Sequence, residues 1–177
     1  AALLERLPKK PARNAAELEL ARQLCRLSCA ARERFLRAHV AAVYDALTAG
    51  RTRHLRVEDL CYAAAESYPG LAPQRAEVEA ESRLRQRDKE GIEIDQGLFI
   101  AQVLADAAAG RHLLHAMLLP REDALALAAD FARSGVAELA GARIERRGKA
   151  ALVTLSNPRY LNAEDGTTLD GLEIAID

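Results

Sequence analysis

Histidines and cysteines are the side chains in this sequence best suited to bind a metal or to act as nucleophiles. His112 and His115 stand three residues apart on a predicted helix, a spacing that can place two imidazoles on one metal ion. No third ligand follows them, and His39 and His54 lie in other segments. We therefore expect no metal site, and we expect the histidines to be ordinary core or surface residues.

The cysteines favour packing over redox chemistry. Cys25 and Cys29 are four residues apart on a predicted helix beside Leu24 and Leu27, which favours small buried hydrophobic residues over a redox pair. With Cys61 the count is odd and shows no paired spacing, so neither a disulfide framework nor a zinc ribbon is indicated. The chain also lacks a glycine-rich phosphate loop, a Gly-x-Ser-x-Gly elbow and a dinucleotide fingerprint.

Composition and charge narrow the class of protein. Of the 177 residues 50% are hydrophobic and only 4% aromatic, and the many Ala, Leu, Arg and Glu residues favour helices. The net charge of -1, with cations such as Arg83 and Arg85 interleaved with acids, gives no basic patch for nucleic acid or an anionic membrane. No apolar run reaches the roughly 20 residues that span a bilayer, and no signal pattern is present. We expect a soluble, cytoplasmic protein.

Helix signals fill the first 140 residues. Asn14 with Glu17 forms a capping-box pattern, and helically spaced apolar residues continue to Gly50, which predicts one long helix, or two nearly collinear ones, over Asn14–Ala49. Its apolar stripe is longer than one small helical domain can cover, so we expect it to dock on the rest of the protein or on a neighbouring subunit. Proline, glycine and capping signals predict four further helices, over Val57–Ser67, Pro73–Gly91, Asp95–Met117 and Arg121–Arg133.

The pattern changes after Gly141. Ile144, Val153 and Leu155 lie in runs typical of strands, separated by a turn at Arg147 and Gly148, and residues 167–177 show helical spacing. We therefore predict a helical domain over residues 1–140 and a ββα segment over residues 141–177. Because a lone hairpin is marginally stable and the last helix carries no C-terminal signal, we expect the chain to be truncated.

The segment 144–164 carries a resemblance to a known family. Asn157 and Pro158 follow the hairpin, and Leu161, Asn162 and Ala163 precede the last helix. This order resembles the start of the crotonase (enoyl-CoA hydratase/isomerase) superfamily. The resemblance implies an α-helical N-terminal domain followed by the start, a β-hairpin plus helix, of an α/β crotonase-type core.

Two longer runs, 83–99 and 162–173, together with the added helical domain, resemble the dioxygenase branch of that superfamily that serves dihydroxyphenylglycine, and hence glycopeptide antibiotic, biosynthesis. The resemblance implies that an arylacetyl-CoA and O2 are converted to an arylglyoxylate and CoA. It also implies that neither a metal nor an organic cofactor takes part. A homo-oligomer, a trimer or a hexamer, is implied as well.

The resemblance also implies contact residues. Arg159, Tyr160 and Leu161 match the loop that lies along CoA, where the cation would meet a phosphate, and Glu164 matches a position next to the acyl group. The alternatives are a solvent-facing turn residue for Arg159 and a helix N-terminal acid for Glu164. The superfamily's oxyanion-hole segments lie later than residue 177, so no catalytic residue is assigned.

Two other functions remain open on the sequence. One is an enoyl-CoA hydratase or isomerase with an extra helical domain, which would carry catalytic glutamates in the later part of the chain. The other is a non-catalytic helical module whose role is assembly.

Overall fold

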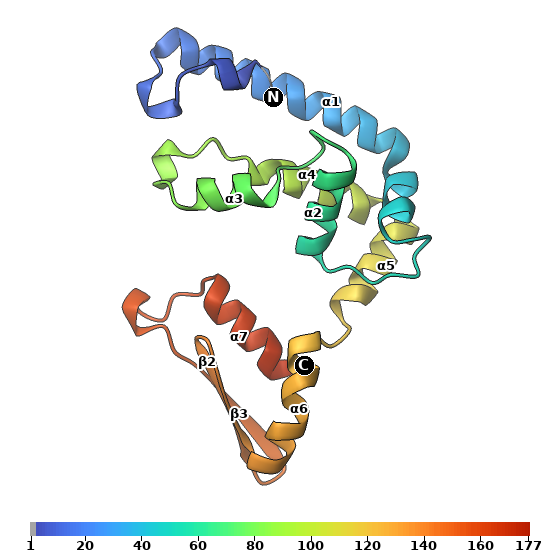
Figure 1. The fold of residues 1–177 in the computed structure, drawn as a ribbon, viewed down its shortest axis with the longest axis vertical. Helices are drawn as coiled ribbons and strands as arrows, with labels where there is room; N and C mark the ends of the chain where they lie inside the picture. Colours follow the sequence, from blue (N-terminus) through green and yellow to red (C-terminus); the bar gives the residue numbers. More distant parts are fainter. Residues whose placement is uncertain (1–2) are drawn as a thin grey trace. The chain divides into compact units, whose positions relative to one another are not determined.

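The structure, a computed structural model, consists of two compact units, one ending at Met117 and the other covering Leu118–Asp177 (Figure 1). It describes residues 3–177, with only the backbone of residue 5. The division differs from the predicted boundary at residue 140, because the helix over Glu122–Ser134 contacts the sheet and the last helix of the second unit.

Helix α1, Ala15–Leu47, is the longest element of the first unit. Asn14 Oδ1 accepts from the amide of Glu17, while the Glu17 carboxylate accepts from the amide of Asn14, so the predicted capping box is confirmed. After the helix, Ala49, Gly50 and Arg51 all adopt positive φ values, of 50°, 66° and 68°. This left-handed turn ends the helix where the sequence predicted its end.

Helix α2, Val57–Ser67, has the predicted bounds, whereas the predicted helix from Pro73 to Gly91 is wrong. The chain forms only α3, Arg75–Ser82, and a 3-10 turn over Gln86–Asp88. The buried carboxylate of Glu81 explains the break, because it accepts hydrogen bonds from the amides of residues 90, 91 and 92. These three backbone amides therefore donate to the Glu81 side chain and not to the carbonyl groups of a continuing helix.

The predicted helix from Asp95 to Met117 is two helices, α4 over Glu93–Ala105 and α5 over Ala107–Met117. Between them Asp106 is extended, and its Oδ1 accepts from the amides of Ala108 and Ala109 at 3.1 and 2.8 Å. By accepting from these two amides, which have no partner within the helix, the Asp106 side chain starts the new helix α5. Gly110 fits the bend, because a Cβ there would lie 2.9 Å from the carbonyl oxygen of Leu104.

The core of the first unit lies among α1, α2, α4 and α5. Its largest fully buried side chains come from all four helices, and they include Leu36, Tyr44, Leu60, Phe99, Val103 and Leu113. Only the second half of α1 contributes heavily to this core, since its buried residues are Ala21 and then Leu36, Val40, Val43, Tyr44 and Leu47. The first half of α1 is therefore less buried than the second half.

The second unit contains helix α6 (Glu122–Ser134), strands β1 (Val136–Leu139), β2 (Ala142–Arg147) and β3 (Ala150–Leu155), a 3-10 turn over Pro158–Tyr160, and helix α7 (Gly166–Ile176). The sheet is antiparallel in the order β1-β2-β3, with Ile144 opposite Val153. The predicted hairpin and final helix are confirmed. Strand β1 was missed, because only four residues separate the C-cap of α6 at Gly135 from the next turn.

Helix α7 packs closely on the turn between β1 and β2. A Cβ on Gly171 would lie 2.3 Å from the carbonyl oxygen of Ala140, and one on Gly141 would lie 3.0 Å from Cγ2 of Thr168. Arg121 ties the start of α6 to the same helix through ion pairs with Asp170 and Glu173. The unit is therefore a helical and antiparallel β arrangement, and its assignment to a crotonase-type core stays a prediction.

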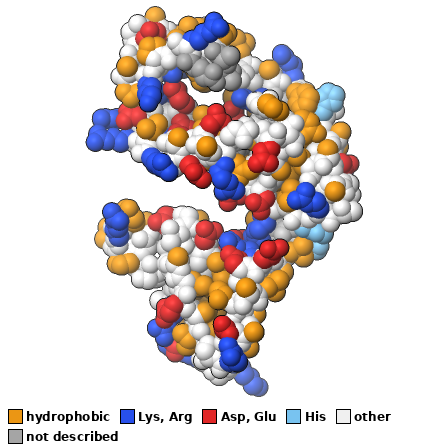
Figure 2. All heavy atoms as spheres, in the orientation of Figure 1, with side chains coloured by type: hydrophobic (Ala, Val, Ile, Leu, Met, Phe, Trp, Pro, Cys, Tyr) orange, Lys and Arg blue, Asp and Glu red, His pale blue; other side chains and the backbone are white. Residues whose placement is uncertain are grey.

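Within residues 3–177, none of the helices combines the length and apolar character that a membrane span requires. Charged side chains are spread over the visible surface of both units, and hydrophobic side chains are exposed among the charged ones (Figure 2). Several of these exposed hydrophobic residues are large, and Leu20, Leu27 and Phe35 among them lie on α1.

Candidate functional site

The predicted contact residues lie in the loop that joins β3 to α7, residues 157–165. Arg159 and Tyr160 form part of the 3-10 turn, and Leu161 follows it with φ 55° and ψ 34°. Asn162 is also left-handed, with φ 58°. Positive φ is uncommon for leucine, so other contacts must hold this backbone in place.

Asn157 and Asn162 supply those contacts. The amide of Asn162 donates to the carbonyl oxygen of Asn157 at 2.8 Å, and Asn162 Oδ1 accepts from the amide of Asn157 at 2.7 Å. Asn157 Nδ2 donates to the carbonyl oxygen of Ala163 and to Asp165 Oδ2, both at 3.0 Å. These bonds close the loop on itself and order its tip. The two asparagines were predicted only to mark the family resemblance, and their role in ordering the loop was not predicted.

Asp165, and not Glu164, is the N-cap of α7. Its carboxylate accepts from the amide of Thr168 at 3.0 Å, and the Thr168 hydroxyl accepts from the amide of Asp165 at 2.9 Å. The pKa of Asp165 is lowered, chiefly by the hydrogen bond from the Thr168 backbone and further by the Asn157 side chain. The spacing Asp-x-x-Thr before an apolar helix is the signal that predicts this cap.

The four predicted contact residues are exposed at the tip of this ordered loop. Leu161 is 96% exposed and Tyr160 is 55% exposed, and the Arg159 guanidinium lies 5.6 Å from the centre of the Tyr160 ring. Glu164 is exposed directly before the N-cap. An ordered tip that carries a cation, an aromatic ring, an apolar residue and an acid is suited to contact a ligand with a phosphate and an apolar part.

A separate apolar groove of about 340 Å³ lies within the second unit. It runs between α6, the sheet and the end of α7, and Leu127, Phe131, Ile144 and Ile174 are among its lining residues. None of the four predicted contact residues belongs to that lining. The groove was not predicted from the sequence, because its residues come from elements far apart along the chain.

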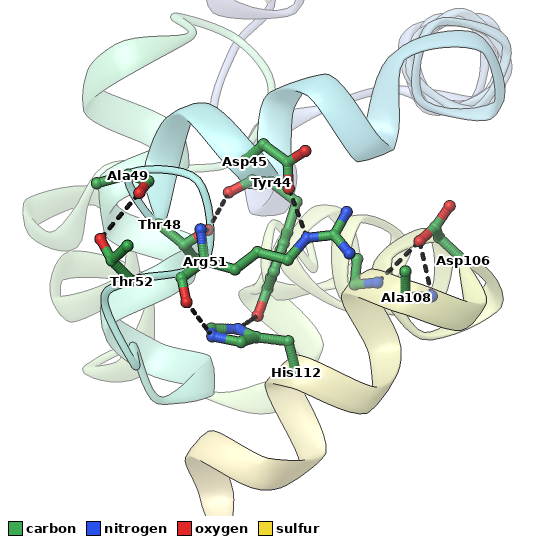
Figure 3. A network of polar contacts seen from close by, with 10 residues as sticks. Tyr44, Asp45, Thr48, Ala49, Arg51, Thr52, Asp106, Ala108 and His112 are labelled. Atoms are coloured by element: carbon green, nitrogen blue, oxygen red, sulfur yellow. Dashed lines mark hydrogen bonds and ion pairs between the residues drawn. The ribbon is translucent and has the colours of Figure 1, made fainter.

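His112 lies in a polar network at the end of α1 (Figure 3). His112 Nδ1 lies 2.7 Å from the Tyr44 hydroxyl, and His112 Nε2 lies 2.9 Å from the carbonyl oxygen of Arg51. A carbonyl oxygen only accepts, so Nε2 carries the proton and Nδ1 accepts from Tyr44. Arg51 Nε donates to Asp45 Oδ1 at 2.6 Å. This bond joins the left-handed turn to the last part of α1.

This network stabilises the turn and leaves no nitrogen of His112 free for a metal. His54 stacks on His112 with ring centres 4.8 Å apart, and His115 meets His54 edge-on at 5.4 Å. Burial raises the pKa of the Tyr44 hydroxyl, in line with its role as a neutral donor. Among the described residues, no group of three or more His, Cys, Asp or Glu side chains has an arrangement that could hold a metal ion.

The cysteines differ in their environment. Cys61 is buried in the core, and burial raises its pKa to about 11, so its thiol is protonated and unreactive at neutral pH. Cys25 and Cys29 are only partly buried. The Cys29 thiol lies 3.8 Å from Asp95 Oδ1, and Asp95 also pairs with Arg32 at 2.8 Å. Burial is therefore observed for Cys61, whereas Cys25 and Cys29, for which it was predicted, are only half-buried.

Comparison with known proteins shows which protein this chain is similar to. No protein-family model matches the sequence. Over 175 residues, however, the chain is 45% identical to a protein of Amycolatopsis orientalis named (3,5-dihydroxyphenyl)acetyl-CoA 1,2-dioxygenase. This chain is similar to that dioxygenase. The match covers 99% of this chain and 40% of the relative, so the chain spans well under half of the relative's length.

The match to the dioxygenase includes residues of both units. Because it covers 175 residues, it includes the helical first unit as well as the loop that carries Arg159 and Glu164. The helical unit is therefore part of the likeness to the dioxygenase and not an unrelated addition. The predicted resemblance to this enzyme is confirmed, and the wider crotonase assignment stays a prediction.

Proposed function

We propose that this chain is part of an oxidoreductase that converts 3,5-dihydroxyphenylacetyl-CoA and O2 to 3,5-dihydroxyphenylglyoxylate and CoA. The observation that carries the proposal is the 45% identity to the dioxygenase over 99% of the chain. Neither a metal nor an organic cofactor takes part, and the reaction serves dihydroxyphenylglycine biosynthesis.

The reaction balances without any further reactant. The α-carbon loses its two hydrogens, one of which ends on the carboxyl group and the other on the CoA thiol. Both atoms of O2 enter the product, one as the new ketone and one in the carboxylate. A thioester next to an aromatic ring acidifies the α-carbon, and hydrogen-bond donors aimed at the thioester oxygen stabilise the resulting enolate. The enolate reduces O2, and the peroxide formed attacks the thioester carbonyl.

In this proposal the second unit begins a crotonase-type core, and the loop 157–165 holds the substrate. Arg159 binds a phosphate of CoA, Tyr160 and Leu161 contact its apolar parts, and Glu164 accepts a hydrogen bond from a phenolic hydroxyl. The ordered backbone of the loop supports this role, because a tip fixed by Asn157 and Asn162 loses little conformational freedom on binding. The exposure of the four side chains supports it as well.

The test follows O2 uptake and thiol release together in the full-length protein that contains this chain. Equal amounts of O2 consumed and CoA released are expected, without added metal and in the presence of a chelator. Hydration of an enoyl-CoA without O2 uptake would instead support the hydratase alternative. Arg159→Ala should raise KM roughly tenfold with little change in kcat, because one charge-assisted contact is lost. Arg147→Ala, at the exposed turn of the hairpin, is the matched control.

A further inference from the structure

Helix α1 carries two apolar faces. One faces the core of the first unit and is made by the buried residues of the second half of the helix, Leu36, Val40, Val43 and Leu47. At about 100° per residue, a second set of residues falls within an arc of roughly 80° that is centred roughly 150° away from the first. This second face consists of Leu20, Leu24, Leu27, Ala31 and Phe35.

Most of the second face is exposed to solvent, and Leu24 is half-buried. Leu27 is 69% exposed, Leu20 is 46% exposed and Phe35 is 41% exposed, although each is large and apolar. Hydrophobic side chains are visible along the course of α1 in the space-filling view (Figure 2). Single exposed leucines are common, but a row of them at helical spacing over about 20 Å is typical of an interaction surface.

The order of residues on this face is complementary to itself when the helix is reversed. In an antiparallel pair that places Leu24 opposite Leu27 of the other copy, Leu20 lies opposite Ala31 and Phe35 lies opposite Ala16. Large side chains then meet small ones at both ends of the seam, as close packing of two helices requires. A parallel pair would instead set Phe35 against Phe35 and Ala31 against Ala31.

Charge favours the same arrangement. Residues 15–25 contain Glu17, Glu19 and Arg22, so two acids outweigh one cation and the net charge is -1. Residues 26–38 contain four arginines (26, 32, 34 and 37) against the single acid Glu33, which gives a net charge of +3. Reversal of the second helix therefore places the acidic half of each helix beside the basic half of the other, and it also opposes the two helix dipoles.

We propose that this face of α1 is a contact between two copies of the chain, formed by an antiparallel pair of α1 helices. The contact is independent of the proposed reaction, so it stands or falls separately from the dioxygenase assignment. It assigns a specific two-fold contact to the expected homo-oligomer, and a contact of this kind would join two trimers into a hexamer.

Sedimentation equilibrium of the 177-residue chain tests the contact. A species of twice 19.2 kDa is expected in the micromolar to millimolar range. Leu27→Glu should weaken association by more than about a hundredfold, because each copy would then bury an unpaired carboxylate. Leu114→Glu, at an exposed leucine of α5, is the matched control and should leave the mass unchanged. Circular dichroism of each variant verifies that the helices are retained.

A mixing experiment tests the antiparallel register. Leu24→Lys and Leu27→Glu should each be monomeric alone, yet an equal mixture should form a mixed dimer. The reason is that the ammonium introduced at position 24 of one copy faces the carboxylate introduced at position 27 of the other only in the antiparallel pair. Failure of the mixture to associate would overturn the antiparallel arrangement. A wild-type chain that stays at 19.2 kDa throughout, or a Leu27→Glu chain that dimerises as the wild type does, would overturn the proposed contact altogether.

Discussion

The side chain of Asn157 is joined to Asp165 by a 3.0 Å hydrogen bond from Nδ2 to Oδ2, and this bond links the end of β3 to the start of α7. The same amide group also donates to the carbonyl oxygen of Ala163. One residue thus fixes both ends of the segment that presents Arg159 and Glu164. The loop is held by its polar side chains, and its apolar side chains are left free for other contacts.

Loss of the Asn157 side chain should loosen this loop. Asn157→Ala removes two hydrogen bonds, so the free energy of unfolding should fall by about 1 to 2 kcal/mol. Hydrogen exchange at residues 157–163 should increase, while exchange in α1 stays unchanged. Thr154→Ala, at an exposed position of β3, should have neither effect. Unchanged exchange in the loop of Asn157→Ala would contradict the role of this residue.

The cap of α7 should make the second unit sensitive to acid. The pKa of Asp165 lies below its ordinary value of 3.8 because the carboxylate accepts from the Thr168 amide. A lowered folded-state pKa means that the stabilisation is present above pH 3.8 and is lost as the pH falls through the folded-state value. Urea unfolding between about pH 6 and pH 2 should therefore show wild type and Asp165→Asn converging in acid. Parallel curves across that range would argue against the cap.

Glu164 should discriminate between substrates in the full-length enzyme. Glu164→Gln retains the shape but removes the charge that would accept from a phenolic hydroxyl, so turnover of the dihydroxylated substrate should fall roughly tenfold to a hundredfold. Turnover of unhydroxylated phenylacetyl-CoA should change little. If both substrates kept their relative efficiency, Glu164 would have no part in holding the aryl group.

Gly171 should be required for the docking of α7. Gly171→Ala places a methyl group 2.3 Å from the carbonyl oxygen of Ala140, so the helix must shift, which costs about 1 to 3 kcal/mol. Gly166→Ala is the matched control on the same helix, because a Cβ there meets nothing within 4 Å. Equal thermal stability of the two variants would show that α7 is not packed as described.

Features encoded by neighbouring residues could be predicted from the sequence. The capping box of Asn14 and Glu17 and the hairpin turn at Gly148 each depend on a few adjacent residues, and each was found where expected. The predictions failed where distant groups decide the backbone. Glu81 reaches residues nine to eleven positions later, and Gly110 allows the approach of Leu104 that accompanies the bend at Asp106.

The candidate site, too, could be predicted from the sequence only in part. Arg159, Tyr160, Leu161 and Glu164 were identified by resemblance, and the structure places all four on one loop. The hydrogen bonds among Asn157, Asn162 and Asp165 that order this loop depend on two left-handed residues, which no local pattern indicated. The apolar groove of the second unit was likewise not predictable, since its lining requires the packing of α6 on the sheet.

Isotope labelling tests the proposed reaction most directly. The full-length protein is incubated with 3,5-dihydroxyphenylacetyl-CoA under ¹⁸O2, and the arylglyoxylate is analysed at once by mass spectrometry, before its ketone exchanges with water. Two heavy oxygen atoms in the product are expected, one in the ketone and one in the carboxylate, together with one CoA released per O2 consumed. A product that carries no ¹⁸O, because its added oxygen comes only from water, would contradict a dioxygenase and would support hydration or hydrolysis instead.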